Sequence, residues 1–135
     1  MMMIETFSPA TKTYKILIIE DEGDICFLLS TILKQEYFEI DTVQTLAQAH
    51  VFLKEETPDL VFLDNNLPDG FGMDLIEPMR KQYPDIKIVM ITGNNVNIAK
   101  KGAILKGADI FLPKPFSSAQ IYDAVEQLIH CRIKH

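Results

Sequence analysis

Short apolar runs rich in β-branched residues alternate along the chain with stretches whose apolar positions recur at helical spacing. The runs have the length and composition of buried strands. They predict five strands, at residues 15–19, 39–43, 60–63, 87–91 and 109–112. Between the first two runs, apolar residues at i, i+3, i+4, i+7 and i+8 form one face of a helix. These residues are Ile25, Leu28, Leu29, Ile32 and Leu33.

Four further helical stretches follow the later strands, and their patterns differ in strength. The stretch around 46–53 repeats the apolar pattern weakly, whereas the stretch at the end of the chain repeats it cleanly. In the stretch 73–83, Pro78 removes one backbone donor, so we expect a kink or a later start. The stretch 95–106 has Gly102 in its middle and little apolar periodicity, so it is the weakest of the predicted helices and we expect it to be mobile.

Five strands alternating with five helices predict an α/β fold with a parallel sheet and helices on both faces. Right-handed crossover connections leave few possible topologies for such a sheet. Ligands of these folds bind beyond the carboxyl ends of the strands, at the point where the strand order reverses. Residues 1–14 are polar and show no period, which predicts a flexible N-terminal tail. The domain is therefore assigned to residues 15–131, with a C-terminal tail at 132–135.

The length and composition describe one globular domain. The chain has 135 residues, of which 47% are hydrophobic and 24% charged, and both fractions are ordinary for such a domain. The two cysteines, Cys26 and Cys131, fit no metal-ligand spacing and no disulfide framework, which favours a reducing, cytoplasmic setting. The apolar runs are strand-sized, so we expect no membrane span. The net charge of −6 argues against a nucleic-acid surface, which needs clustered Lys and Arg.

Chemically useful side chains stand at the predicted carboxyl ends of the strands. Glu20 and Asp21 follow the first strand, and Asp64 follows the third. If these strands are neighbours, the carboxylates converge, and two such charges ~4 Å apart repel by about 4 kcal/mol at an effective dielectric constant of about 20. Mg²⁺ relieves such repulsion, because it binds one or two carboxylates, waters and phosphate oxygens. With the hydroxyl of Thr92 and the charge of Lys114, these groups can hold a phosphoryl group for a carboxylate nucleophile.

The motifs that contain these residues occur together and in a fixed order. They are Ile-Ile-Glu-Asp-Glu (18–22), Phe-Leu-Asp-Asn-Asn-Leu-Pro (62–68), Gly72, Ile-Thr-Gly (91–93) and Phe-Leu-Pro-Lys-Pro (111–115). Through them, the run from Lys15 to about Ile129 resembles the receiver domain of bacterial response regulators. The resemblance implies a doubly wound, five-stranded parallel sheet in the order 2-1-3-4-5. It also implies a signalling phosphoacceptor of a two-component phosphorelay rather than an enzyme.

The resemblance assigns the metal site residue by residue. It makes Asp64 the phosphoacceptor and Asp21 a direct ligand of Mg²⁺. Glu20 is expected to act on the metal through water, and the backbone carbonyl of Asn66 to complete the protein ligands. Glu20 is a common variant of the family's aspartate, so this departure removes no chemical group.

The resemblance also assigns the residues that contact and sense the phosphoryl group. Lys114 would pair with that group, and Pro115 is expected to follow a cis peptide bond that orients the lysine. Thr92 would bind a phosphoryl oxygen and couple to Phe111, the switch residue. Phe111 replaces the frequent tyrosine, so its outward state has no hydroxyl to hydrogen-bond.

The expected partners follow from this assignment. The phosphoryl donor would be a histidine kinase or a phosphotransfer protein, and slow self-catalysed hydrolysis would end the signal. The output would be read by an unidentified downstream protein on the face made by the fourth helix, fifth strand and fifth helix. A phosphorylation-dependent homodimer through that face is an alternative.

Three other functions fit parts of the sequence. A phosphatase of the haloacid-dehalogenase kind uses a strand-end aspartate and Mg²⁺, but it needs a second aspartate where this chain has Asn66. A flavodoxin-like carrier shares the topology, but the acids at 20–22 would repel the phosphate of FMN. A degenerate receiver used only for docking would not need Asp64, Thr92 and Lys114 together.

Overall fold

The computed structural model describes residues 12–93 and 96–130, and its centre is one five-stranded parallel sheet. The strands run in the order β3-β2-β4-β7-β8, which is the predicted 2-1-3-4-5 order of the main strands. Their bounds are β2 (Tyr14–Ile19), β3 (Phe38–Val43), β4 (Leu60–Asp64), β7 (Lys87–Thr92) and β8 (Ile110–Pro113). The order reverses between β2 and β4, so the expected ligand position lies beyond the ends of these two strands.

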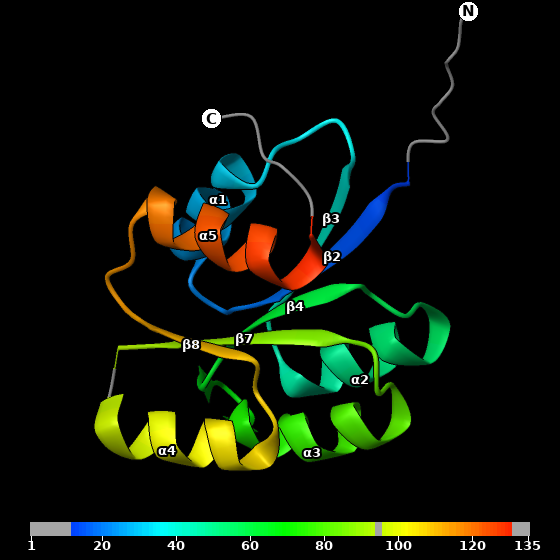
Figure 1. Ribbon diagram of the computed structural model, residues 1–135. Helices are drawn as coiled ribbons and strands as arrows, with labels where there is room; N and C mark the ends of the chain where they lie inside the picture. The colour runs from blue at the N-terminus through cyan, green and yellow to red at the C-terminus, as the bar shows by residue number, and fades with distance from the viewer. Residues whose placement is uncertain (1–11, 94–95, 131–135) are drawn as a thin grey trace, which may run out of the picture.

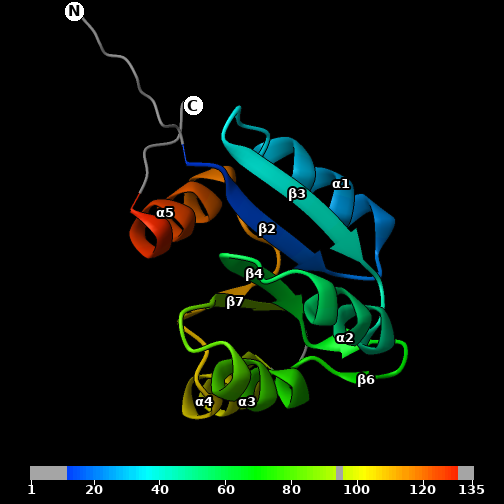
Figure 2. The ribbon, with the colours of Figure 1, turned by 90° about the vertical axis from the view of Figure 1, so that its right-hand side faces the viewer.

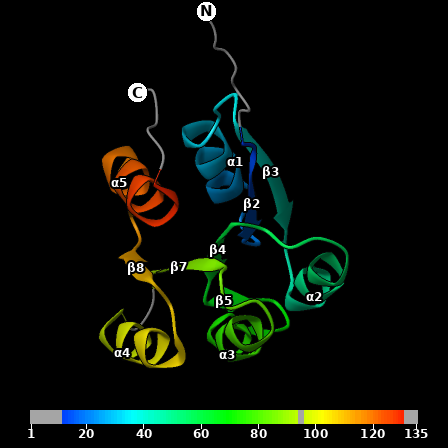
Figure 3. The same ribbon diagram turned by 45° about the vertical axis from the view of Figure 1, so that its right-hand side comes forward.

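Five helices cover the two faces of the sheet (Figures 1 and 3). One face carries α1 (Gly23–Ile32) and α5 (Ser118–Ile129). The other face carries α2 (Leu46–Glu55), α3 (Met73–Gln82) and α4 (Val96–Lys106). Among the described residues, none of the helices has both the length and the apolar character needed to cross a membrane.

The sheet separates two hydrophobic cores, and the strand residues alternate between them. Leu17 and Ile19 of β2 pack with the α2–α4 side, whereas Ile16 and Ile18 pack with the α1–α5 side. Strand β4 is buried on both faces along its whole length. Because helices cover both faces, its sequence is a continuous apolar run that ends in a buried aspartate, Asp64.

A small hairpin follows β4 and was not predicted. It consists of β5 (Asn66–Leu67) and β6 (Gly70–Phe71), which pair antiparallel around a two-residue turn. Figure 2 shows the hairpin beside α2, at the carboxyl end of the sheet. The next residue, Gly72, lies so close to the carbonyl oxygen of Asp64 that a Cβ would be 2.1 Å from it. Only glycine therefore fits at this position of the motif.

Two boundaries differ from the prediction. Helix α3 begins at Met73, so the later start expected from Pro78 is wrong. The side-chain oxygen of Asn65 accepts a hydrogen bond from the Met73 N–H at 2.9 Å, which stabilises the first turn upstream of the proline. The first strand begins at Tyr14, inside the predicted tail, because the Tyr14 N–H donates to the carbonyl of Tyr37. Most of both predicted tails, and residue 95 of the fourth helix, lie outside the described residues.

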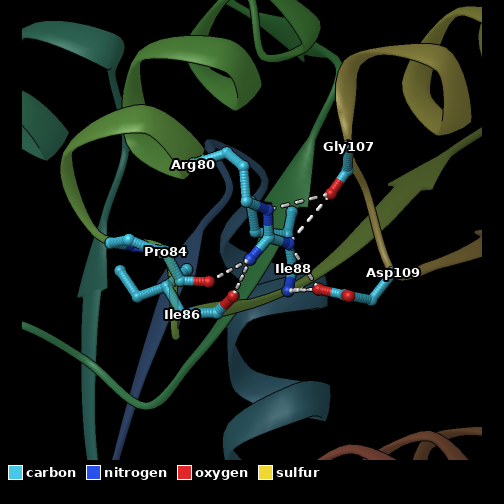
Figure 4. A network of polar contacts seen from close by, with 6 residues as sticks. All are labelled: Arg80, Pro84, Ile86, Ile88, Gly107 and Asp109. Atoms are coloured by element: carbon cyan, nitrogen blue, oxygen red, sulfur yellow. Dashed lines mark hydrogen bonds and ion pairs between the residues drawn. The ribbon is translucent and has the colours of Figure 1, made fainter.

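At the amino ends of β7 and β8, one guanidinium joins three segments of the chain (Figure 4). Arg80 of α3 forms a 2.6 Å ion pair with Asp109, and the same carboxylate accepts from the Ile88 N–H at 2.8 Å. The remaining Arg80 donors reach backbone carbonyls of Pro84, Ile86 and Gly107. This network fixes the end of α4 and the starts of two strands to α3.

Candidate functional site

Three carboxylates meet beyond the carboxyl ends of β2 and β4. Glu20 and Asp21 follow β2 directly, and Asp64 is the last residue of β4. One oxygen from each of the three lies within 4.8 Å of the others. The predicted convergence of these acids is confirmed, and its cause is the pairing of β2 with β4 in parallel register.

The three carboxylates differ in their exposure. Glu20 and Asp64 are buried, at 0% and 2% exposure, whereas Asp21 is exposed. Burial raises the pKa of Glu20 and of Asp64, and the nearby charge of Lys114 offsets only part of each shift. Among the described residues, Glu20 Oε1 and Asp64 Oδ1 are buried and have no hydrogen-bond partner. Two oxygens of a buried acidic pair thus lack a hydrogen bond, a setting that favours a nearby cation.

Lys114 supplies the positive charge of the site. Its Nζ forms ion pairs with Glu20 Oε1 at 2.9 Å and with Asp64 Oδ1 at 3.5 Å. Neither oxygen accepts a hydrogen bond in these contacts. It also lies 3.2 Å from Oε1 of Glu22, which the sequence analysis did not single out. Burial alone would lower the pKa of Lys114, but Glu20 and Asp64 together raise it above its ordinary value. The lysine is therefore charged and shared among several acids.

The backbone around Lys114 fixes where this charge enters the site. The Lys114 N–H donates to the carbonyl of Thr92 at 2.9 Å, so the lysine lies next to the end of β7. The peptide bond between Lys114 and Pro115 is cis, as the resemblance implied.

Thr92 and Asn66 lie beside the acids and contact each other. Thr92 is the fully buried last residue of β7, and its hydroxyl oxygen accepts a 3.3 Å hydrogen bond from Nδ2 of Asn66. The sequence pointed to the backbone carbonyl of Asn66 but not to this side-chain contact. A cleft of about 280 Å³ opens above these groups. It is lined by Asp21, Glu22, Asp64, Asn66, Gly93 and Lys114.

The composition of this site suits a hard divalent cation. Its donors are carboxylate oxygens, with no thiolate or imidazole in the acidic cluster that the described residues form. Mg²⁺ prefers such oxygen ligands and keeps several waters, for which the open cleft leaves room. The observation that fits this ion is that Glu20 Oε1 and Asp64 Oδ1 are buried and accept no hydrogen bond, although Lys114 is nearby.

The predicted switch residue, Phe111, stands apart from the acids. It pairs in register with Met90 on β7, two residues before Thr92. Its ring is half-buried and packs against the core on the α2–α4 side. The ring is thus partly inward already, and a further inward turn would bury only the remainder.

This fold and this acidic site define a known class of protein. Residues 16–126 match the response regulator receiver domain, and the chain belongs to this family. Receiver domains are signalling phosphoacceptors of two-component systems rather than classical enzymes. They bind Mg²⁺ at an acidic site of this kind, and they take part in signalling with histidine kinases.

Two curated relatives are transcriptional regulators. The chain is 37% identical to the transcriptional regulatory protein KdpE of Staphylococcus aureus over 103 residues, which are 76% of this chain and 44% of that protein. It is 33% identical to the phosphate regulon transcriptional regulatory protein PhoB of Rhizobium meliloti, covering 85% of this chain and 52% of that one. The chain thus spans about half the length of these relatives.

Solved structures of receiver proteins have the same fold. A two-component response regulator from Clostridium difficile superposes with a TM-score of 0.82 at 29% identity, covering 87% of this chain and 97% of that one. A CheY-like receiver domain protein from Methanospirillum hungatei superposes with a TM-score of 0.81 at 27% identity, covering 88% and 96%.

Proposed function

We propose that Asp64 accepts a phosphoryl group from a phosphohistidine of a histidine kinase or phosphotransfer protein. The P–N bond of the donor breaks, and a P–O bond to the carboxylate of Asp64 forms. The observation that carries this proposal is the buried Asp64 carboxylate, whose Oδ1 accepts no hydrogen bond and lies 3.5 Å from the Lys114 ammonium. A carboxylate in this setting is a nucleophile with its counter-charge already in place.

Mg²⁺ would be held by Asp21, Asp64 and the backbone carbonyl of Asn66, with Glu20 acting through water. Bound there, it would neutralise charge on the phosphoryl oxygens. Lys114 would shift from its contacts with the acids toward the phosphoryl group and pair with it. The Thr92 hydroxyl would donate to a phosphoryl oxygen, which is compatible with the Asn66 contact because a hydroxyl both accepts and donates.

The experiment that tests this proposal is labelling by acetyl phosphate followed by intact-mass spectrometry. We expect one added phosphoryl group on the wild type with Mg²⁺, and none with chelator or in Asp64→Asn. Asp59→Asn is a control that changes an aspartate at the opposite end of β4, and it should label like the wild type. Equal labelling of Asp64→Asn would refute the assignment. Absence of labelling in the wild type would favour the docking-only alternative.

We propose further that phosphorylation is read on the surface formed by α4, β8 and α5. Movement of Thr92 toward the phosphoryl group would leave space that the half-buried Phe111 ring fills. Burying a whole Phe side chain contributes ~1.5–3 kcal/mol, and the part still exposed here contributes a fraction of that. Helix α4 presents Ile98 and Leu105 to solvent, at 77% exposure each, so its outer face could bind a partner protein or a second copy of the chain.

Amide chemical shifts with and without beryllofluoride, a phosphoryl mimic, test this readout. We expect shifts in α4 and β8 in addition to the loops around Asp64. Phe111→Ala should still be labelled by acetyl phosphate but lose the distant shifts. Shifts confined to the loops in the wild type would remove the α4–β8–α5 surface from the mechanism.

The cellular setting proposed is cytoplasmic, with a downstream protein as target. The net charge of −6 does not favour a nucleic-acid contact from this domain. The two curated relatives are named as transcriptional regulators, so a longer product of the same gene could act on DNA through another part.

A further inference from the structure

The hairpin β5–β6 is fastened to two helices, one at each end. At its base, Oδ1 of Asn65 accepts from the Met73 N–H of α3 at 2.9 Å. At its tip, Asp69 accepts from two N–H groups of α2, with 2.8 Å from Leu46 to Oδ1 and 3.0 Å from Ala47 to Oδ2. The segment between these two attachments contains Asn66.

The contact of Asp69 with α2 completes the N-terminus of that helix. The first N–H groups of a helix have no partner within it. Thr45, the N-cap residue, accepts from the third of them, that of Gln48, at 3.0 Å. Asp69 accepts from the first two, and its charge suits the positive end of the helix dipole. These two backbone hydrogen bonds lower the pKa of Asp69, so the contact is made by the carboxylate.

The tip of the hairpin also packs against the first residue of α2. Gly70 lies so close to Leu46 that a Cβ on the glycine would be 2.9 Å from Cδ1 of the leucine. Leu67, which pairs with Gly70, is buried in the core on the α2–α4 side. Moving the tip would therefore disturb the pairing that also holds Asn66 opposite Phe71.

We propose that Asp69 is a positioning residue for the metal site, because it holds the hairpin that carries the Asn66 carbonyl. This inference rests on the proposed function, in which that carbonyl is a ligand of Mg²⁺. Asp69 is neither among the residues that line the cleft nor a member of the acidic cluster. Its effect would reach the metal only through the backbone of the hairpin.

The physical reason is preorganisation. Mg²⁺ demands nearly octahedral geometry, so a carbonyl ligand on a loosened loop must be ordered when the ion binds. Losing Asp69 should therefore weaken Mg²⁺ binding. The nucleophile Asp64, Thr92 and Lys114 stand at the ends of core strands, so phosphorylation at saturating Mg²⁺ should stay close to the wild-type rate.

The test compares Asp69→Ala with a matched control, Thr45→Ala. Both variants remove hydrogen-bond acceptors from the N-terminus of α2, but only the first releases the hairpin. Mg²⁺ affinity is measured by titration of amide chemical shifts, and the Mg²⁺ dependence of acetyl phosphate labelling is measured beside it. We expect Asp69→Ala to raise the Mg²⁺ dissociation constant about ten-fold, as loss of an outer residue that orients a ligand does. Thr45→Ala should keep the wild-type affinity, and Asp69→Asn, which retains one acceptor oxygen, should lie between.

The outcomes separate this inference from the proposed function. Wild-type Mg²⁺ affinity in Asp69→Ala would overturn the positioning role while leaving phosphorylation of Asp64 intact. Equal weakening in Thr45→Ala would also overturn it, since the effect would then belong to the stability of α2. A wild type that binds Mg²⁺ but takes no phosphoryl group would defeat the proposed function, and the titrations would still decide the role of Asp69.

Discussion

Two clusters of charge lie at opposite ends of the same sheet, and they are built on opposite principles. At the amino ends of β7 and β8, Arg80 has its donors matched by three backbone carbonyls and by Asp109. At the carboxyl ends of β2 and β4, Glu20 and Asp64 are buried beside one lysine, and each keeps an oxygen without a hydrogen bond. The first cluster is complete within the chain, and the second is not.

This difference indicates what each end of the sheet contributes to stability and to ligand binding. A matched, partly buried network stabilises the fold, because breaking it leaves several polar groups without partners. A crowded carboxylate pair destabilises the ligand-free fold and favours any cation that binds it. Stability and ligand binding are thus assigned to opposite ends, which permits substitutions at one end to leave the other unchanged.

The largest effect should come from breaking the complete cluster. Arg80→Met keeps an unbranched apolar stem but removes the guanidinium, which leaves the carbonyls of Pro84, Ile86 and Gly107 without this donor. We expect a loss of about 3 kcal/mol in the free energy of unfolding, measured by urea titration, after allowance for partial exposure of the pair. Labelling by acetyl phosphate of the folded variant should be unchanged.

Lys106→Met is the control for this substitution. Its 3.4 Å ion pair with Glu77 is largely exposed, so its loss should cost less than about 0.5 kcal/mol. If Arg80→Met cost no more than this control, the network would not be a stabilising unit. If it abolished labelling, the two ends of the sheet would not be independent.

The next effect should come from relieving the incomplete cluster. Asp64→Asn removes one of two buried charges, and we expect it to stabilise the metal-free protein by about 1–2 kcal/mol at neutral pH, since Lys114 already offsets part of the repulsion. Mg²⁺ at about 100 times its dissociation constant adds about 2.7 kcal/mol to the free energy of unfolding of a protein that binds it only in the folded state. Thermal melts with Mg²⁺ should therefore reverse the order of the two proteins.

The pH dependence of this difference follows from the raised pKa of Asp64, which is due first to burial. The folded state binds the proton more tightly than the unfolded state, so protonation stabilises the wild type. That stability is fully present below the ordinary aspartate pKa and is lost as pH rises through the raised value. The advantage of Asp64→Asn in chelator should thus be full above the raised pKa and shrink as pH falls. An advantage that grows on acidification would contradict this account.

The sequence predicted most of the sheet because its signals are local. The five apolar runs match the strands within one residue at each end, since strands buried on both faces must be apolar throughout. The hairpin β5–β6 was missed because its strands have two residues each and carry no period. Gly102 was read as a helix-weakening residue, but a Cβ there would lie 2.6 Å from Sδ of Met73. The glycine therefore lies directly against the Met73 side chain of α3, a contact that no local pattern reveals.

The acidic site was predictable because side chains at the carboxyl ends of neighbouring parallel strands lie at the same edge of the sheet. Two other contacts could not be predicted, because each depends on a loop conformation that brings distant residues together. Asn66 and Thr92 are 26 positions apart, and Asp69 and Leu46 of α2 are 23 positions apart. Arg80 likewise gave no signal, since a lone arginine on a helix is ordinarily a solvated charge. Its position became informative only when Gly107 and Asp109 were placed beside it.

The smallest effect should distinguish the exposed acid from the buried pair. Asp21 is exposed, although one of its oxygens lies within 4.8 Å of Glu20 and Asp64. Repulsion between charges in water is about 1 kcal/mol at ~4 Å, so Asp21→Asn should stabilise the metal-free protein by only about 0.5 kcal/mol. As the proposed direct ligand, however, Asp21 should matter for the ion, and the variant should lose most of the stabilisation by Mg²⁺. Melts in chelator and in Mg²⁺ measure both quantities on one sample. A gain in chelator as large as that of Asp64→Asn would mean that burial does not set the strength of the repulsion, and the contrast between the exposed and buried acids would fail.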